Sequence, residues 1–221
     1  MLFDLRSRGR RRTVQFVYLG LAVLMGGGLV LFGVGAGNGN GGLLNAFTGN
    51  GSGNSQGSVL SQAEKTAVKA TQRDPNSSAA WASLIAARWE NATGGSNYNS
   101  TTGNFTTSGK KELAATTTAW ARYTQLTKNP NSDLATLAAR AYAHLAEYPA
   151  SANAWEIVSA ANPTSAKGYE CLAVSAYAAQ QTRKGDLALA KALTLVPKLS
   201  QSTLKSQVQA AKTTPSIAQA C

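Results

Sequence analysis

A recurring proline register constrains the fold of this chain more than any other feature of its sequence. Proline ends a helix because it has no amide donor, and a serine two residues later can cap the next helix. Each Pro-x-Ser here precedes an apolar helical pattern, and the four begin at Pro75, Pro130, Pro149 and Pro163. The residue six positions after each proline should fall one turn inside the new helix, on the face that packs. These residues are Trp81, Thr136, Trp155 and Tyr169.

The spacing of the prolines indicates a repeated unit of about 34 residues. The interval from Pro130 to Pro163 and the interval from Pro163 to Pro197 both match this length closely. The interval from Pro75 to Pro130 is longer and matches one such unit plus an insertion. Pro149 falls between the two helices of a unit. This pattern predicts an all-α fold built from stacked helical hairpins.

The residues inside these units resemble the tetratricopeptide repeat family. In that family the first helix carries an aromatic residue, a leucine, a small residue and a tyrosine, and the second carries small residues and ends in proline. The matching residues are Ala70, Pro75, Trp81, Leu84, Leu137, Tyr142, Tyr169, Leu172, Ala192 and Pro197. The resemblance covers about residues 59–197. It implies a solenoid of helical hairpins that binds segments of other proteins; an irregular alanine-rich bundle is the alternative.

We place the repeat domain at residues 59–212. Residues 91–109 are rich in Ser, Thr, Asn and Gly, which predicts a surface insertion within one unit. A short turn is expected near Gly185-Asp186, between the helices of the last unit. A solenoid also needs an end cap with a polar outer surface. The candidate is a final helix whose apolar residues share one face, namely Leu199, Leu204 and Val208.

The two cysteines of the chain are Cys171 and Cys221. Outside the cytoplasm an even number of cysteines can pair. A bond would tie the C-terminal tail, residues 213–221, back to the first helix of the last unit. Closing a loop of about 50 residues would stabilise the fold by roughly 4 kcal/mol in the chain-entropy model. The alternative is a buried free Cys171 and a frayed tail, because sequence does not give the Cα separation that a bond needs.

Residues 13–36 contain no charged side chain and predict one transmembrane helix. As a helix they would extend about 36 Å, and a hydrocarbon core is about 30 Å thick. A cleavable signal peptide is the alternative, but its apolar region is shorter, about 7–15 residues. Residues 37–58, rich in Gly and Asn, predict a flexible linker.

An arginine cluster before the apolar run predicts how the chain is oriented. Only Asp4 opposes its five members, which are Arg6, Arg8, Arg10, Arg11 and Arg12. Because cytoplasmic flanks are enriched in Lys and Arg, we expect residues 1–12 in the cytoplasm and the repeat domain beyond the membrane. The Ala/Gly-rich composition suggests a bacterial protein, whose domain would then lie in the periplasm or at the cell exterior.

The sequence lacks the patterns of an active site, a metal centre or a cofactor site. His144 is the only histidine and lies in a helical pattern, and no cysteine pair has metal-ligand spacing. No phosphate-binding glycine motif has the strand–helix context that it needs. The acids Glu147, Glu156 and Glu170 fall at different helical phases. We therefore expect no catalytic residue, no metal and no cofactor.

The formal net charge of +11 does not by itself predict nucleic-acid binding. Such binding needs a concentrated basic stripe, often with stacking aromatic residues, whereas the bases beyond residue 12 are scattered along the chain. We therefore expect membrane and protein partners, and no nucleic acid.

Together these features predict a single-pass membrane protein whose repeat domain is a protein-binding adaptor or chaperone-like scaffold. The overall plan resembles the ancillary subunits of bacterial translocons, which implies partners in protein export. The alternative is an envelope-structural protein that binds a cell-wall polymer through a basic surface. A groove lined by Trp81, Trp89 or Tyr142 would favour peptide recognition, and loss of binding in moderate salt would favour the polymer.

Overall fold

The computed structural model describes residues 55–221, and side chains from residue 62 onward. The transmembrane helix expected at residues 13–36 and the basic tail at residues 1–12 lie outside these residues. So does the linker expected at residues 37–58, except for its last four residues, which begin the helix α2 (Ser55–Arg73). Within the described part of the chain, no helix has the length and apolarity that crossing a membrane requires.

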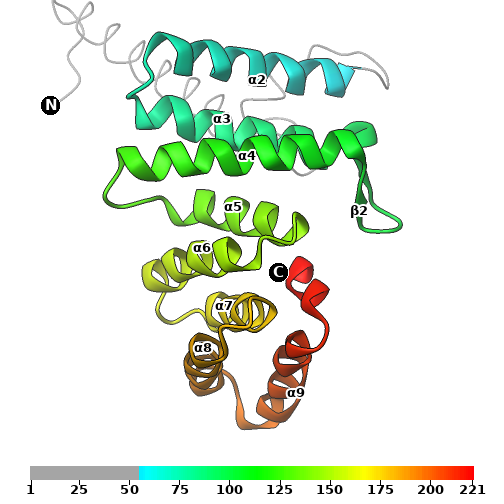
Figure 1. The fold of residues 1–221 in the computed structure, drawn as a ribbon, viewed down its shortest axis with the longest axis vertical. Coiled ribbons are helices and arrows are strands. Elements are labelled where there is room, and N and C mark those ends of the chain that lie inside the picture. The colour runs from blue at the N-terminus through cyan, green and yellow to red at the C-terminus, as the bar shows by residue number, and fades with distance from the viewer. Residues whose placement is uncertain (1–54) are drawn as a thin grey trace, which may run out of the picture. The chain divides into compact units, whose positions relative to one another are not determined.

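The described chain is mostly helical, in agreement with the all-α prediction (Figure 1). The helices after α2 are α3 (Ser78–Thr93), α4 (Thr107–Leu126), α5 (Ser132–His144), α6 (Tyr148–Ala161), α7 (Ala166–Ala178), α8 (Thr182–Leu195) and α9 (Lys198–Gln209). Three short 3-10 turns are η1 (Gly95–Asn97), η2 (Ala210–Lys212) and η3 (Pro215–Ala220). A two-stranded hairpin joins β1 (Tyr98–Asn99) to β2 (Asn104–Phe105).

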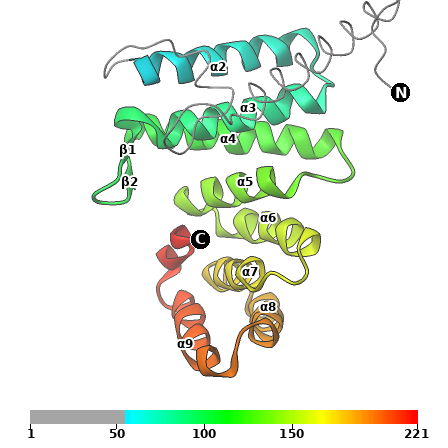
Figure 2. The same cartoon turned by 180° about the vertical axis from the view of Figure 1, so that it is seen from behind.

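Consecutive helices pack as antiparallel hairpins that stack on one another (Figure 2). The pairs are α3 with α4, α5 with α6 and α7 with α8, and α6 also packs closely on α7. One hydrophobic cluster runs through the stack from Ala67 on α2 to Cys221. Alanine supplies many of its fully buried positions, which lets helix backbones approach closely.

The connections within the last two hairpins repeat the same backbone geometry at the interval of one repeat unit. After α5 and after α7 the chain turns through a residue with positive φ, Ala146 at 61° and Gln180 at 59°. In each turn the next amide donates to a carbonyl five residues earlier, at 2.8 Å in both. This is the Schellman arrangement that closes a helix. The turn expected near Gly185 is therefore wrong, since Gly185 lies inside α8.

The serine caps expected from the proline register form at only one of the four sites. Ser77 caps α3 by accepting a hydrogen bond from the amide of Ala80 at 3.2 Å. Asn131, rather than the serine after it, caps α5. Ser165 stands at the start of α7 without a capping bond from its side chain. Ser151 lies inside α6, where it is buried, because Pro149 occupies the first turn of that helix.

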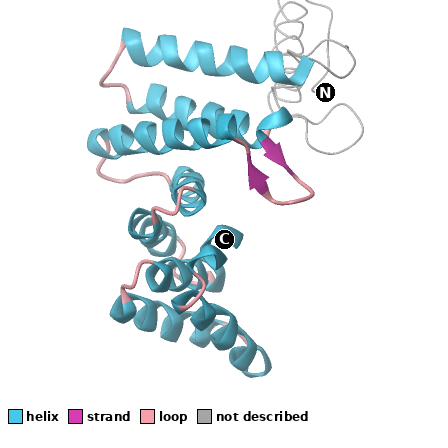
Figure 3. Cartoon of the chain, turned by 45° about the vertical axis from the view of Figure 1, so that its right-hand side comes forward, coloured by secondary structure: helices cyan, strands magenta, loops and turns pink. Residues whose placement is uncertain are grey.

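The segment predicted as an insertion forms an ordered connection between α3 and α4. Its ends, residues 91–93 and 107–109, extend those two helices, and the hairpin lies between them (Figure 3). Tyr98 pairs with Phe105 across the two strands, and the two rings are 4.8 Å apart. A Cβ atom on Gly109 would overlap the carbonyl oxygen of Asn97, so glycine lets η1 sit against the start of α4.

The last helix partly matches its predicted role as an end cap. Leu204 and Val208 are buried, but Leu199 is 94% exposed, so the prediction that it packs is wrong. Beyond α9 the chain turns back through η2 and η3, which pack against α7 and α5. Cys171 on α7 and Cys221 form a disulfide with their Cα atoms 5.6 Å apart.

Candidate functional site

The residues that define the repeat pattern divide between the core and the starts of the helices. Buried members are Leu84, Trp155, Leu172 and Ala192, and half-buried members are Ala70, Trp81, Pro130, Leu137, Tyr142 and Tyr169. The other four prolines are exposed at helix ends, namely Pro75, Pro149, Pro163 and Pro197. These side chains therefore hold the helices together, and two of them, Tyr169 and Leu172, also border an open cleft.

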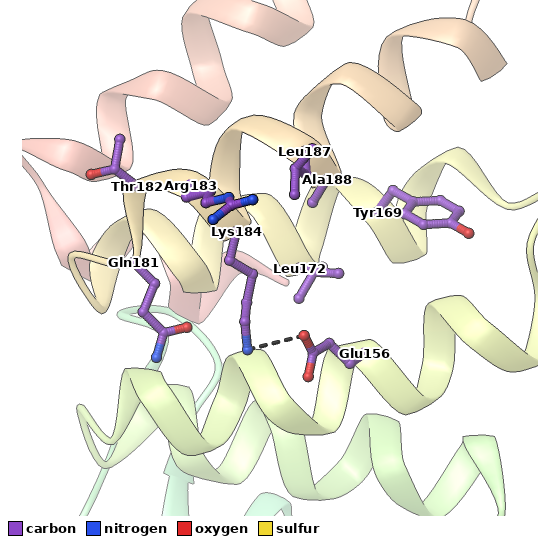
Figure 4. Close-up of a pocket in the computed structure, with 9 residues that line it drawn as sticks. All are labelled: Glu156, Tyr169, Leu172, Gln181, Thr182, Arg183, Lys184, Leu187 and Ala188. Carbon is purple, nitrogen blue, oxygen red and sulfur yellow. Dashed lines mark ion pairs between the residues drawn. The ribbon is translucent and has the colours of Figure 1, made fainter.

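This cleft lies between α6 and α8, with α7 beneath it, and has a volume of about 700 Å³. Leu172 and Ala188 supply apolar surface inside it, and Leu187 on the rim is 66% exposed. Figure 4 shows Tyr169 and Gln181 at opposite ends of the cleft. An exposed leucine beside an open apolar cleft is the arrangement expected of a surface that another molecule covers.

Positive charge dominates the polar side of the cleft. Lys184 forms an ion pair with Glu156 at 3.0 Å (Figure 4). It also donates to the side-chain oxygen of Asn153 at 3.1 Å. Within the part of the chain that the structure describes, Arg183 has no carboxylate within ion-pair distance. The cleft therefore combines apolar surface with an uncompensated guanidinium group.

The first turn of α8 holds both cations, which is an unusual place for them. The amide ends of a helix attract acids and disfavour bases by a few tenths of a kcal/mol or more each. Arg183 and Lys184 nevertheless follow the start of α8 at Thr182, and no acid lies in that first turn. Two bases at such a position were the signal in the sequence that could have located this cleft. Sequence reasoning missed both residues because it treated them as scattered surface charge.

A second, smaller pocket of about 260 Å³ lies where the hairpin, α3, α5 and the C-terminal residues meet. Its walls include Trp89, Phe105, Arg140 and His144. The sequence predicts a groove lined by Trp81, Trp89 or Tyr142. Of these three residues, Trp89 alone borders one of these two cavities. The backbone oxygen of Cys221 accepts a hydrogen bond from Arg140 Nε at 3.0 Å. The guanidinium group of this pocket is therefore already bonded within the chain.

His144, the single histidine, packs in this pocket against the ring of Phe105, with the centroids 4.7 Å apart. Burial, and next the charge of Arg140, lower the pKa of the imidazole below its usual value. Both effects favour the neutral ring. The contacts are those of a packing residue, which agrees with its position in the helical pattern.

A polar cluster at the junction of α2, α3 and α4 also escaped the sequence analysis. Arg88 pairs with Glu64 at 3.3 Å and donates to the backbone oxygen of Ala115 at 2.9 Å. Asn91 donates to the other oxygen of Glu64. Burial, and next the charge of Glu64, raise the pKa of Glu112 beside them. Because Arg88 is committed to these bonds, the cluster fastens α2 to the hairpin of α3 and α4.

Neither metal ligands nor known relatives point to another site. No group of three or more His, Cys, Asp or Glu side chains in residues 62–221 is arranged to hold a metal ion. Comparison of the chain with protein-family models, curated proteins and solved structures finds no match. The geometry of the cleft between α6 and α8 is therefore the basis for the function proposed below.

Proposed function

We propose that the chain is a tetratricopeptide-like scaffold that binds a segment of another protein in the cleft between α6 and α8. The observation that carries this proposal is the cleft itself, where an exposed Leu187 and an uncompensated Arg183 border the same apolar surface. The recurrence of equivalent turns at Ala146 and Gln180, at an interval of about 34 residues, supports the assignment to this repeat class. The enclosing hairpins supply a rigid support, which is how solenoid repeats present binding surfaces.

The chemistry of the cleft favours an acidic segment that also carries aliphatic side chains. Aliphatic groups would cover Leu172, Ala188 and the exposed part of Leu187. A carboxylate would pair with Arg183, and the amide end of α8 would add to the attraction. A helix with one apolar and one acidic face meets both requirements, and binding of such a helix in an apolar groove is a common recognition mode.

The setting of this scaffold follows from residues outside the described structure. We propose that residues 13–36 anchor it in the membrane and that the arginine cluster keeps residues 1–12 in the cytoplasm. Residues 37–54 would then tether the repeat domain close to this membrane, on its non-cytoplasmic side. A chaperone-like adaptor at a bacterial protein-export machinery fits this plan, because a tethered groove could hold a segment of an emerging chain or of a translocon subunit.

Photo-crosslinking from within the cleft tests the proposal. A photoreactive phenylalanine derivative replaces Leu187 in the full-length protein in its native membrane, and the control carries it at Leu199, which is 94% exposed but outside the cleft. We expect position 187, and not 199, to crosslink a defined segment that contains acidic and aliphatic residues. Arg183→Glu should weaken this crosslink at least fivefold, or about 1 kcal/mol, while Lys198→Glu should not.

Two results would overturn the cleft as the binding site. The first is equal crosslinking from positions 187 and 199, and the second is a crosslink that Arg183→Glu leaves unchanged. A variant lacking residues 1–36 and exported by another signal separates the role of the anchor. Loss of translocon subunits or emerging chains from its crosslinks would support the role in export.

Binding of a cell-wall polymer is a second candidate, which one observation favours. Beyond residue 12 the chain has 16 Lys and Arg against 9 Asp and Glu. Of these bases, four pair with acids in the described residues, namely Arg88, Lys167, Lys184 and Lys212. Binding through the remaining charges would fall steeply between about 0.05 and 0.3 M salt. Cosedimentation with purified wall polymer across that range would reveal it.

A further inference from the structure

The C-terminal residues cover one face of the helical stack. We use the term C-terminal segment for residues 210–221, and inner face for the surface of α5 and α7 against which this segment packs. Figures 1 and 2 show α7 between α8 and the C-terminal segment, so the inner face is distinct from the cleft. In this arrangement the chain occupies one of its own surfaces.

The C-terminal segment packs as a bound peptide would, with apolar side chains buried and polar side chains exposed. Ala211, Ala218 and Cys221 are buried, with exposed fractions of 0%, 1% and 8%. Thr214 and Ser216, by contrast, are exposed. Small apolar side chains thus enter the stack, while polar ones remain in solvent.

Four polar or covalent contacts fasten this segment. Besides the disulfide to Cys171 and the hydrogen bond from Arg140, Lys212 lies 4.3 Å from the centre of the Tyr177 ring. Lys212 also approaches Asp186 at 3.7 Å. Exposed charged contacts of this kind are worth little, about 0–1 kcal/mol each. The disulfide is therefore the strongest of these contacts.

The surface under the C-terminal segment is apolar and would be costly to leave in water. Val174 and Ala178 follow Cys171 by three and seven residues, so they share its side of α7. Both are buried, as is Cys171 itself. Removal of the segment would expose this strip next to Arg140, which would lose its acceptor.

We propose that the inner face is a second protein-binding surface, which the Cys171–Cys221 disulfide keeps closed with the chain's own C-terminal segment. Its partner is a short segment with small apolar side chains, of the same chemistry as the one now seated there. A backbone oxygen of that partner takes the place of the Cys221 oxygen on Arg140.

Opening requires a dithiol, such as a dithiol oxidoreductase, as the reductant. One of its thiolates attacks the sulfur of Cys221, which is the more exposed of the two cysteines. The bond between Cys221 and Cys171 breaks, a mixed disulfide forms, and Cys171 leaves as a thiolate that takes up a proton. The second thiol of the reductant then displaces Cys221, so the reductant ends as a disulfide and both cysteines end as thiols.

Hydrogen exchange of the full-length protein in detergent tests the opening step. The oxidised protein is compared with protein reduced by dithiothreitol. We expect exchange to accelerate at least tenfold in residues 213–221 and in α5 and α7, with α3 and α4 unchanged. Unchanged exchange in residues 213–221 after verified reduction would overturn the proposal, and so would an equal acceleration throughout the chain.

Peptide binding tests the surface itself. The probe is a fluorescent peptide that copies residues 213–221 with serine in place of Cys221. We expect it to bind the double variant Ala218→Asp/Cys221→Ser, which expels the segment, at least tenfold more tightly than the oxidised protein. The control, Ser216→Asp, changes an exposed position and keeps the disulfide, so it should bind the peptide at least tenfold more weakly than the Ala218→Asp/Cys221→Ser protein.

Equal binding of the peptide to the oxidised protein would overturn the proposal. Absence of binding to an Ala218→Asp/Cys221→Ser protein that retains native circular dichroism would do the same. If that variant loses its fold, the dithiothreitol-reduced natural chain replaces it in the same titration. Crosslinking from position 187 should be unchanged in Cys221→Ser, so failure at the inner face and failure at the cleft are distinguishable.

Discussion

Individual small residues decide how closely the helices of this stack approach. Ser151 on α6 and Gly185 on α8 occupy equivalent places in successive repeat units. Ser151 is fully buried and donates to the backbone oxygen of Ala139 on α5 at 2.9 Å. Gly185 instead faces the ring of Tyr177, whose hydroxyl donates to Asp186 at 2.7 Å. The large ring of Tyr177 on α7 is thus accommodated by Gly185 on α8, which has no side chain.

Gly185→Ala should therefore destabilise the protein although alanine favours helix. A Cβ atom would overlap the Tyr177 ring, and overpacking of this kind costs about 1–3 kcal/mol. The matched control is Gly168→Ala, whose Cβ would lie 3.5 Å from the nearest atom, Ser159 Cα. Because that contact is an ordinary one, this variant should be neutral or gain up to about 1 kcal/mol. Urea unfolding followed by circular dichroism measures both, and equal effects would contradict the assignment.

At the scale of the element, the helices were predictable from the proline register but several of their ends were not. Prolines report where one helix stops, so the sequence located several helix boundaries, but it misplaced the turn between α7 and α8. Which polar residue caps the next helix depends on local backbone geometry, and Asn131 rather than the predicted serine accepts the amide hydrogen bonds of α5. The turns through Ala146 and Gln180 have positive φ without the glycine that usually marks such a turn, so the sequence did not predict them.

The difference between two equivalent caps gives a prediction about α5 and α7. Asn131 accepts bonds from the amides of Asp133 and Leu134 at 2.8 and 3.0 Å, and Asn131→Ala should cost about 0.5–2 kcal/mol. Ser165, one repeat unit later, makes no capping bond with its side chain, so Ser165→Ala should cost less than about 0.5 kcal/mol. Thermal unfolding of both variants provides the measurement. A larger loss from Ser165→Ala would show that α7 is capped in solution as the sequence predicted.

At the scale of the whole molecule, the sequence predicted a stack of helices but not which of its surfaces remain open. The repeat pattern concerns residues that pack between helices, such as Leu84 and Leu172. The cleft depends on Arg183 and Leu187, which face away from those contacts and therefore follow no repeat pattern. The place of the C-terminal segment depends on contacts between residues far apart in sequence, such as Arg140 with Cys221. Periodicity carries no information about such contacts.

The disulfide should contribute to the stability of the last hairpin as well as closing the inner face. It joins residues 50 apart, and that loop contains α8 and α9. Cross-linking a loop of this length removes about 4 kcal/mol of unfolded-chain entropy, within a usual range of about 2–5 kcal/mol for native bonds. Cys221→Ser should therefore lower the free energy of unfolding of the last hairpin by that amount in urea. In stacked helical hairpins each hairpin depends mainly on its neighbours, so hydrogen exchange in α3 and α4 should report a smaller loss than hydrogen exchange in α8. Dithiothreitol should reproduce the change in the natural chain and leave Cys221→Ser unaffected.

A loss below about 1 kcal/mol would mean that the C-terminal segment stays seated without its bond, and the closed inner face would then rest on packing alone.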